Sequence, residues 1–212
     1  MEFHSFLKYV PKIAKESLPA TSAHLKMTPL FRHELMRAIN YDSLQPKKAA
    51  VLMLVYPKNN ETHIVLIVRN TYPGVHSSQI AFPGGKVELE DDSLAHTALR
   101  EAEEEIGVNR MYVEIIKSFT EVYIPPSNFL VSPFLGISTQ ELNFVRQENE
   151  VADIIELSMN DFLDDSNVVM RKLTTSYANE IDVPAFLVKE HIVWGATAMM
   201  MSELKETIKK VL

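Results

Sequence analysis

The sequence predicts an α/β protein in which helices cover a mixed β-sheet, preceded by a helical extension at the N-terminus. Apolar, strand-like stretches are interleaved with helical segments that lie 20 or more residues apart. The first 45 residues instead show the three- and four-residue apolar spacing of helices. The chain has 212 residues, 46% hydrophobic and 23% charged, which suits one globular domain with a sizeable core. We therefore expect a single domain over residues 1–212, with residues 1–45 as the helical extension.

Each element follows from its local pattern. Residues 6–18 and 29–39 are expected to be helical, and Gln45-Pro46 ends that region. Two strands joined by the turn-forming "PKNNE" predict a β-hairpin, and a loop follows up to "FPGG". The remaining expected elements are strands at 112–119 and 129–138 around a loop, a strand and short helix within 150–165, and a helix from about Thr197 to the end.

An acidic stretch follows the two glycines of "FPGG". Between Glu88 and Glu105 there are eight carboxylates and one basic residue, Arg100, so this segment carries a formal charge equal to the chain's −7. Residues 94–106 are predicted to form a helix, capped by Asp92 or Ser93. The helix should end at Gly107. Its expected core-facing stripe consists of Ala95, Leu99, Ala102 and Ile106.

Three carboxylates near the C-terminal end of this helix are electrostatically unfavourable. Glu101, Glu104 and Glu105 repel one another at helical spacing and oppose the helix dipole at its C-terminal end. A solvated acidic face or a Ca²⁺-stabilised surface would be the structural explanation. We favour a bound divalent cation, because a set of oxygen ligands selects Mg²⁺ or Mn²⁺ and suits phosphate chemistry. Arg100, four residues before Glu104, can hold a carboxylate in one orientation.

The segment resembles the Nudix box, which reads Gly, five residues, Glu, seven residues, then Arg-Glu-apolar-any-Glu-Glu-any-Gly-apolar. Residues 100–108 match the second half in full. Counting eight back from Arg100 places Asp92 at the position of the first Glu, with six residues between Gly85 and Asp92. The fold that this resemblance implies is the Nudix-type α/β/α sandwich with a mixed sheet.

The motif with this extra residue between Gly85 and Asp92 resembles that of the Nudix branch that hydrolyses coenzyme A. That branch has a further signature upstream of the motif. This chain matches it at "VLIVRN" (Arg69, Asn70), at His76 with Gln79, and at "FPGG". It departs from the signature at Gly74 and Ser78. The segment "VWGATA" near the C-terminus is also similar. The resemblance implies a pyrophosphatase of coenzyme A or acyl-CoA that releases 3′,5′-ADP and 4′-phosphopantetheine. Hydrolysis of ADP-ribose, NADH or a (d)NTP is the alternative, and a non-catalytic nucleotide-binding module is the alternative of another class.

The resemblance also implies residue roles. Glu101, Glu104 and Glu105 would bind Mg²⁺ or Mn²⁺, and Glu104 or Glu101 would act as general base beside Arg100. The implied substrate-binding residues are Arg69, Gly84, Gly85 and Lys86. Arg69 would contact a phosphate such as the 3′-phosphate of coenzyme A, with a structural salt bridge as its alternative. Glu150 would be a remote base or an additional ligand, with a solvated loop position as its alternative.

Composition limits the partners and the location. The chain lacks a broad basic field and has no cysteine, so nucleic acid, disulfides and thiolate metal sites are not expected. The longest apolar run, residues 49–56, is too short for a membrane span. We expect a cytoplasmic protein that acts on a small-molecule nucleotide. Met199–Met201 would serve as helix core or as the face of a homodimer.

Overall fold

The computed structural model describes residues 1–29, 44–70, 79–175 and 178–212. The predicted helix at 29–39 lies almost entirely outside these residues, as do Gly74, His76 and Ser78. Among the residues that are described, no helix has the length and apolar character needed to cross a membrane.

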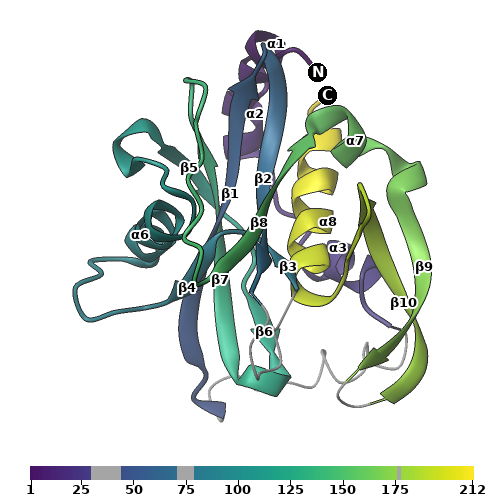
Figure 1. Ribbon diagram of the computed structural model, residues 1–212. Coiled ribbons are helices and arrows are strands. Elements are labelled where there is room, and N and C mark those ends of the chain that lie inside the picture. The colour runs from purple at the N-terminus through teal and green to yellow at the C-terminus, as the bar shows by residue number, and fades with distance from the viewer. Residues whose placement is uncertain (30–43, 71–78, 176–177) are drawn as a thin grey trace.

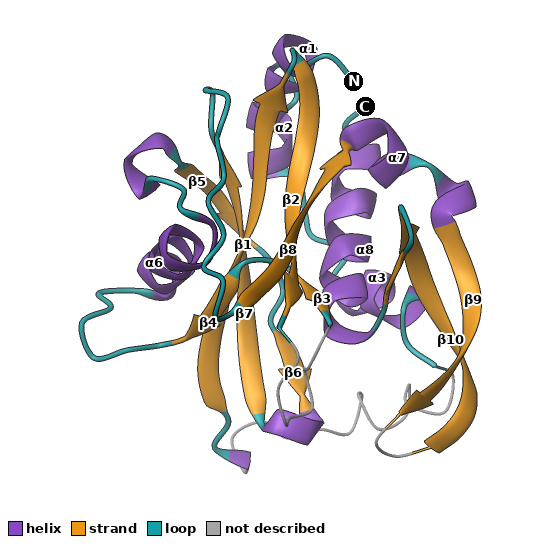
Figure 2. Ribbon diagram, viewed as in Figure 1, coloured by secondary structure: helices purple, strands orange, loops and turns teal. Residues whose placement is uncertain are grey.

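A mixed β-sheet forms the centre of the molecule (Figure 2). Within the described residues it has eight strands, and the order of its main path is β3-β2-β1-β7-β5, with β4 beside β1, β6 beside β7 and β8 beside β2. Its strands are β1 (Lys47–Lys58), β2 (Glu61–Arg69), β3 (Ile80–Ala81), β4 (Gly84–Lys86), β5 (Glu114–Ser118), β6 (Val122–Ile124), β7 (Phe129–Ile137) and β8 (Val151–Ser158). The sheet is mixed because β1 pairs in parallel with β7 and antiparallel with β2 and β4.

The predicted hairpin is confirmed. Strands β1 and β2 pair antiparallel from Val55 opposite Ile64 to Lys58 opposite Glu61. The turn between them contains Asn59 and Asn60, both left-handed with φ of 50° and 63°, a conformation that asparagine tolerates. The prediction of a loop up to Gly85 is partly wrong, since the described part of this segment contains the short strand β3 and the start of β4.

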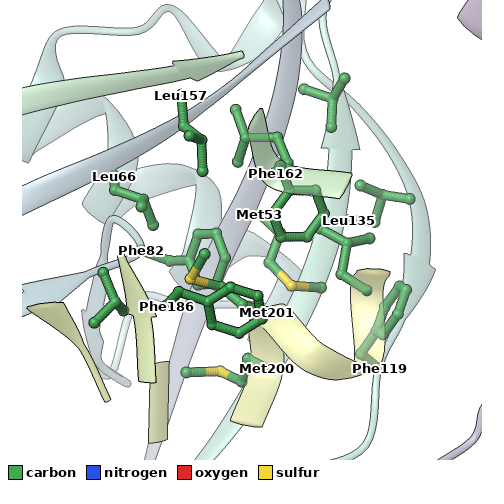
Figure 3. Close-up of a cluster of buried hydrophobic side chains, with 14 of the residues drawn as sticks. Met53, Leu66, Phe82, Phe119, Leu135, Leu157, Phe162, Phe186, Met200 and Met201 are labelled. Carbon is green, nitrogen blue, oxygen red and sulfur yellow. The ribbon is translucent and has the colours of Figure 1, made fainter. Parts of the chain in front are cut away.

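Helices cover both faces of this sheet (Figure 1). Helix α6 (Leu94–Ile106) lies on one face and α8 (Gly195–Lys209) on the other, which confirms the expected sandwich. Alternation along β1 divides its side chains between the faces: Leu52 packs in the cluster under α6, and Met53 packs in the larger cluster with α8. Figure 3 shows that Met53, Met200 and Met201 lie together in this larger core.

Met199, Met200 and Met201 are at most 7% exposed, so they serve as helix core and not as the face of a dimer.

The shorter helical segments connect the larger elements. They are α7 (Met159–Leu163), η2 (Arg110–Tyr112), η3 (Pro125–Ser127) and η4 (Asp165–Asn167).

A second, antiparallel sheet lies beyond α8 and was not predicted (Figure 1). It contains β9 (Val168–Thr175), β10 (Ala178–Val188) and β11 (His191–Val193). Pro184 in the middle of β10 argues against a strand, because proline cannot donate to the ladder. In the structure Pro184 pairs with Met170 of β9, while β11 covers only Phe186–Val188 on the other side of the strand. The proline therefore lies where β10 has an open edge.

The N-terminal extension is helical but broken into short pieces, α1 (Phe3–Leu7), α2 (Val10–Lys15) and α3 (Thr21–Lys26). Phe6 and Ile13 are fully buried in the same core as α8. The carboxylate of Glu203, on α8, accepts hydrogen bonds from the backbone N–H of Ala20 and from Thr120. The extension is thus part of the domain's core.

Candidate metal and catalytic centre

Helix α6 begins and ends at the predicted residues. The Ser93 hydroxyl accepts a hydrogen bond from the backbone N–H of His96 at 3.1 Å, and Gly107 adopts a left-handed φ of 69°. The predicted core stripe is confirmed in part, because Ala102 and Ile106 are buried, and Ala98, which was not expected there, is buried with them. Ala95 and Leu99, which were expected in the stripe, are only half-buried. The small alanines let the helix lie close to the sheet, and its buried face also includes one glutamate.

That glutamate is Glu105, whose residue is 1% exposed. Its Oε2 accepts a hydrogen bond from the backbone N–H of Gly84 at 2.8 Å, and Oε1 lies 3.3 Å from Nη1 of Arg69. Burial raises the pKa of the Glu105 carboxyl to about 7, although Arg69 and the Gly84 N–H oppose the rise. The partly exposed guanidinium of Arg69 therefore neutralises the buried Glu105 carboxylate only in part.

Glu101 lies beside it, over Gly85. A Cβ atom at Gly85 would come within 2.4 Å of the Glu101 carboxylate, so the carboxylate occupies the space that a side chain would need. The side chain of Glu101 is 13% exposed. Burial raises the pKa of its carboxyl, Arg100 opposes this, and the charges of Glu104 and Glu150 add to the rise. Two carboxyls with raised pKa thus flank the Gly84-Gly85 turn.

Arg100 organises this end of the site. Its Nε and Nη2 donate to the two carboxylate oxygens of Asp91 at 2.9 and 3.0 Å, and Nη2 also donates to the Lys86 carbonyl at 3.0 Å. Its Nη1 donates to both Glu101, at 3.0 Å, and Glu104, at 3.1 Å. The hydrogen bonds from Arg100 hold the pKa of Asp91 well below its usual range, and Asp91 in turn raises the pKa of Arg100. One guanidinium therefore positions two predicted metal ligands.

The acid that contacts Arg100 is Asp91, and the assignment of Asp92 by counting is wrong. The Asp91 side chain is fully buried and also accepts a hydrogen bond from the Thr97 hydroxyl at 2.8 Å, whereas Asp92 is exposed. Five residues separate Gly85 from Asp91, the usual number for the motif, and eight separate Asp91 from Arg100. The surplus residue thus lies at the start of the helix, after the acid.

Glu104 and Glu150 lie at the margin of the site. The Glu104 side chain is 57% exposed and reaches the site through Arg100. Glu150 is exposed, but its loop is held in place because the Asn70 backbone N–H donates to the Glu150 carbonyl at 2.9 Å. The Gln147 N–H likewise donates to the Glu105 carbonyl at 2.9 Å. The charge of Glu150 adds to the rise in the pKa of the Glu101 and Glu105 carboxyls, which burial mainly causes.

Most of the predicted site residues therefore converge in one place, namely Glu101, Glu105, Arg100, Arg69, Gly84 and Gly85. Lys86 contributes its carbonyl there, while its ammonium group lies near Phe129. No three acidic or histidine side chains of the described residues come close enough to bind one ion in their present positions. Each carboxylate is instead held by Arg100, Arg69 or a backbone N–H.

Comparison with known proteins agrees with this geometry. The family model described as a NUDIX domain matches residues 46–177. The chain is 32% identical over 180 residues to a protein named "Uncharacterized Nudix hydrolase NudL" from Enterobacter sp. (strain 638), covering 82% of this chain and 90% of that protein. A protein of the same name from Photorhabdus laumondii is 28% identical over 163 residues, covering 77% and 86%.

Solved structures of low sequence identity share the fold. The Nudix hydrolase RenU from M. smegmatis superposes with a TM-score of 0.54 at 14% identity, covering 79% of this chain and 88% of that one. A MutT/nudix family protein from Enterococcus faecalis gives 0.50 at 15% identity, covering 90% and 75%. At these identities the similarity supports the architecture alone.

Proposed function

Because this chain belongs to the Nudix hydrolase family, we propose that it is a metal-dependent pyrophosphatase whose substrate is coenzyme A or an acyl-CoA. The observation that carries the catalytic part is the pair of carboxylates around the Gly84-Gly85 turn. Glu105 is buried against the Gly84 N–H, and Glu101 lies over Gly85. An enzyme fits this arrangement better than a binding module, because every carboxylate of the motif after Arg100 is present and positioned by Arg100, Arg69 or Gly84.

A divalent metal fits the donors that are present. All of the candidate ligands are carboxylate oxygens, which Mg²⁺ and Mn²⁺ prefer. Burial raises the pKa of both Glu101 and Glu105, so a cation bound between them would stabilise their ionised forms. We assign Glu101, Glu104 and Glu105 as the ligands. When bound, the metal would neutralise pyrophosphate oxygens and make the attacking water more acidic.

The chain's own residues have separate roles in this proposal. Arg100 keeps Glu101 and Glu104 on one side of α6 and anchors them to the buried Asp91. Arg69 is the counter-ion of Glu105, and it would be free to contact a substrate phosphate if a metal took over the neutralisation of that carboxylate. Gly84 and Gly85 let the backbone approach the phosphates, with the exposed Lys86 beside them. Glu101 or Glu104 accepts the proton of the attacking water.

Coenzyme A is proposed because two segments that resemble the coenzyme A branch meet in space. The hydroxyl of Thr197, in "VWGATA", donates a hydrogen bond to the Ile80 carbonyl at 2.9 Å. Ile80 lies two residues before the "FPGG" turn, whose Phe82 is 1% exposed. The C-terminal segment thus supports the strand that leads into the catalytic turn. The relatives named NudL are themselves uncharacterised, so the substrate rests on these residues.

Incubation with a panel of substrates tests the proposal. The protein with Mg²⁺ or Mn²⁺ is given coenzyme A, ADP-ribose, NADH and dNTPs, and the products are identified by mass spectrometry. We expect 3′,5′-ADP and 4′-phosphopantetheine from coenzyme A. Cleavage of ADP-ribose, NADH or a dNTP in place of coenzyme A would overturn the proposed substrate. If no compound is cleaved, the proposal that the protein is an enzyme is overturned.

Matched variants on the same helix show whether the proposed site carries the activity. Glu101→Gln and Glu105→Gln should each lower kcat by at least about 100-fold, because even changes to residues outside the ligand set can cost 10–100-fold. Glu103→Gln is the control, since Glu103 pairs with Arg110 at 3.3 Å outside the site. Equal activity in all three variants would contradict the assignment of the ligands.

A further inference from the structure

Two lysines beside the catalytic turn lie against one aromatic ring. The Nζ atoms of Lys47 and Lys86 each lie 5.9 Å from the centroid of the Phe129 ring. Among the residues that the structure describes, neither ammonium group forms an ion pair with a carboxylate. We propose that Lys47, Lys86 and Phe129 form a binding subsite for a phosphate carried on the ribose of the substrate's adenosine half, such as the 3′-phosphate of coenzyme A. This inference rests on the proposed function.

The topology brings these residues together at one end of the sheet. Strand β1 has β7 on one side and β4 on the other, with Lys47 opposite Phe129 and Ala49 opposite Lys86. Side chains at paired positions point to the same face of a sheet, and residues two apart on a strand share a face. Lys86, Lys47 and Phe129 therefore share the face of the sheet that carries α8.

The catalytic turn lies immediately next to this subsite but faces the other way. Gly85 is paired with Ala50 and faces Glu101 on α6, whereas the next residue, Lys86, points to the opposite face. In the described sheet β4 pairs only with β1, so it forms an edge of the sheet at this point. A ligand of nucleotide length can pass around that edge, with its pyrophosphate at Glu101 and its adenosine end at Lys47.

Charge explains why this place suits an anion. Like charges near one another are unfavourable, and attraction of each ammonium to the ring offsets part of that repulsion. A phosphate dianion would neutralise both lysines, and an aromatic ring offers a surface for the base. Arg69 lies beside Glu105 on the catalytic side of the sheet, so in this proposal the phosphate that it contacts belongs to the pyrophosphate. Within the described part of the chain, Lys47 and Lys86 are thus positive charges close to the turn that form no ion pair.

Calorimetric binding of two nucleotides tests the subsite without turnover. 3′,5′-ADP and 5′-AMP differ only in the ribose phosphate, and we expect the wild-type protein to bind 3′,5′-ADP at least about tenfold more tightly. In the double variant Lys47→Gln/Lys86→Gln the two affinities should agree within about twofold. Equal affinities in the wild type, or a preference that survives in the double variant, would overturn the subsite.

Two controls separate local from general effects. Lys47→Arg/Lys86→Arg keeps both charges and should keep the preference. Lys12→Gln removes a charge from another lysine–aromatic contact, 5.4 Å from the Tyr9 ring, and should change nothing. The preference should also fall as ionic strength rises. Failure of coenzyme A hydrolysis with this preference intact would overturn the proposed substrate alone, and loss of the preference with hydrolysis intact would overturn the subsite alone.

Discussion

Replacing Glu105 by glutamine should make the metal-free protein more stable at alkaline pH while it abolishes activity. The carboxyl is 1% exposed, and burial raises its pKa from 4.5 to about 7. Since a tenfold change in acidity is worth about 1.4 kcal/mol, the ionised carboxylate costs the native state roughly 3 kcal/mol. Glutamine keeps an oxygen for the Gly84 N–H and loses only the partly exposed pair with Arg69, worth about 1 kcal/mol or less.

The sign of the pH dependence follows from the direction of the shift. Between pH 4.5 and about 7 the native state binds more protons at Glu105 than the unfolded state does, so the stability of the wild type falls as pH rises through this window. The variant lacks this slope. At pH 8 its Tm should therefore exceed that of the wild type by roughly 4–10 °C for a chain of this size, and at pH 4.5 the gain should vanish.

Thermal unfolding at pH 4.5 and pH 8, with EDTA and then with Mg²⁺, measures both effects. Mg²⁺ should stabilise the wild type at pH 8 by more than it stabilises Glu105→Gln, because the variant lacks one of the three proposed carboxylate ligands. A variant that is less stable than the wild type at pH 8 in EDTA, or a difference of the same size at both pH values, would refute this reasoning.

Further variants test other parts of the site and its support. Asp91→Asn should lower kcat/KM by about 10–100-fold through loss of the arginine's anchor, with the exposed Asp92→Asn within about twofold of wild type in the same assay. Gly84→Ala should cost about 2 kcal/mol or more in urea unfolding, because φ is 154° and a Cβ would lie 2.3 Å from a backbone oxygen. Gly85→Ala should keep the Tm within a few degrees but lower kcat by about tenfold or more, because its Cβ meets only the movable Glu101 carboxylate. Glu203→Gln should cost about 3 kcal/mol near neutral pH in chemical unfolding and less near pH 4.

The pH dependence at Glu203 has the opposite sign to that at Glu105. Burial raises the pKa of the Glu203 carboxyl, but His24, whose Nε2 lies 3.4 Å from Oε2, and the hydrogen bonds from Thr120 outweigh it, so the pKa is lowered overall. Its stabilising contribution is therefore present above the carboxyl's unfolded pKa and is lost as pH falls through the folded value. An effect of Glu203→Gln that is larger at pH 4 than at pH 7 would contradict this account.

Local sequence patterns were sufficient for the elements whose signals are strong and continuous. The hairpin around Asn59-Asn60, the helix between Ser93 and Gly107, and the last helix all lie where apolar periodicity and capping residues placed them. The second sheet was not predicted because Pro184, in its central strand, argues against a strand there. The local sequence does not show that the strand has an open edge at this position. The N-terminal helices were predicted as longer units because periodicity does not mark where a short helix ends.

The candidate site could be predicted in composition but not in orientation. The motif identified Glu101, Glu104 and Glu105 as a set, but a rotation of one residue decides which of them faces solvent and which is buried. Glu104 is on the outside and Glu105 is against the Gly84 N–H, so the three carboxylates differ in environment and in pKa. Glu105 accepts its hydrogen bond from a backbone N–H, which every residue except proline has, so the local sequence gives no signal of this difference.

The position of the surplus residue shows why counting along a motif can assign the wrong acid. Ser93 fixes the first turn of α6, and the chain before it must bring one carboxylate back to Arg100. Asp91 achieves this because its oxygens also accept from the Thr97 hydroxyl, one turn inside the helix, and from the Glu88 N–H in the preceding loop. Asp92 lies next to the cap and faces solvent. The acid that contacts Arg100 is thus decided by which one the capped turn directs inward, and five residues separate Gly85 from that acid.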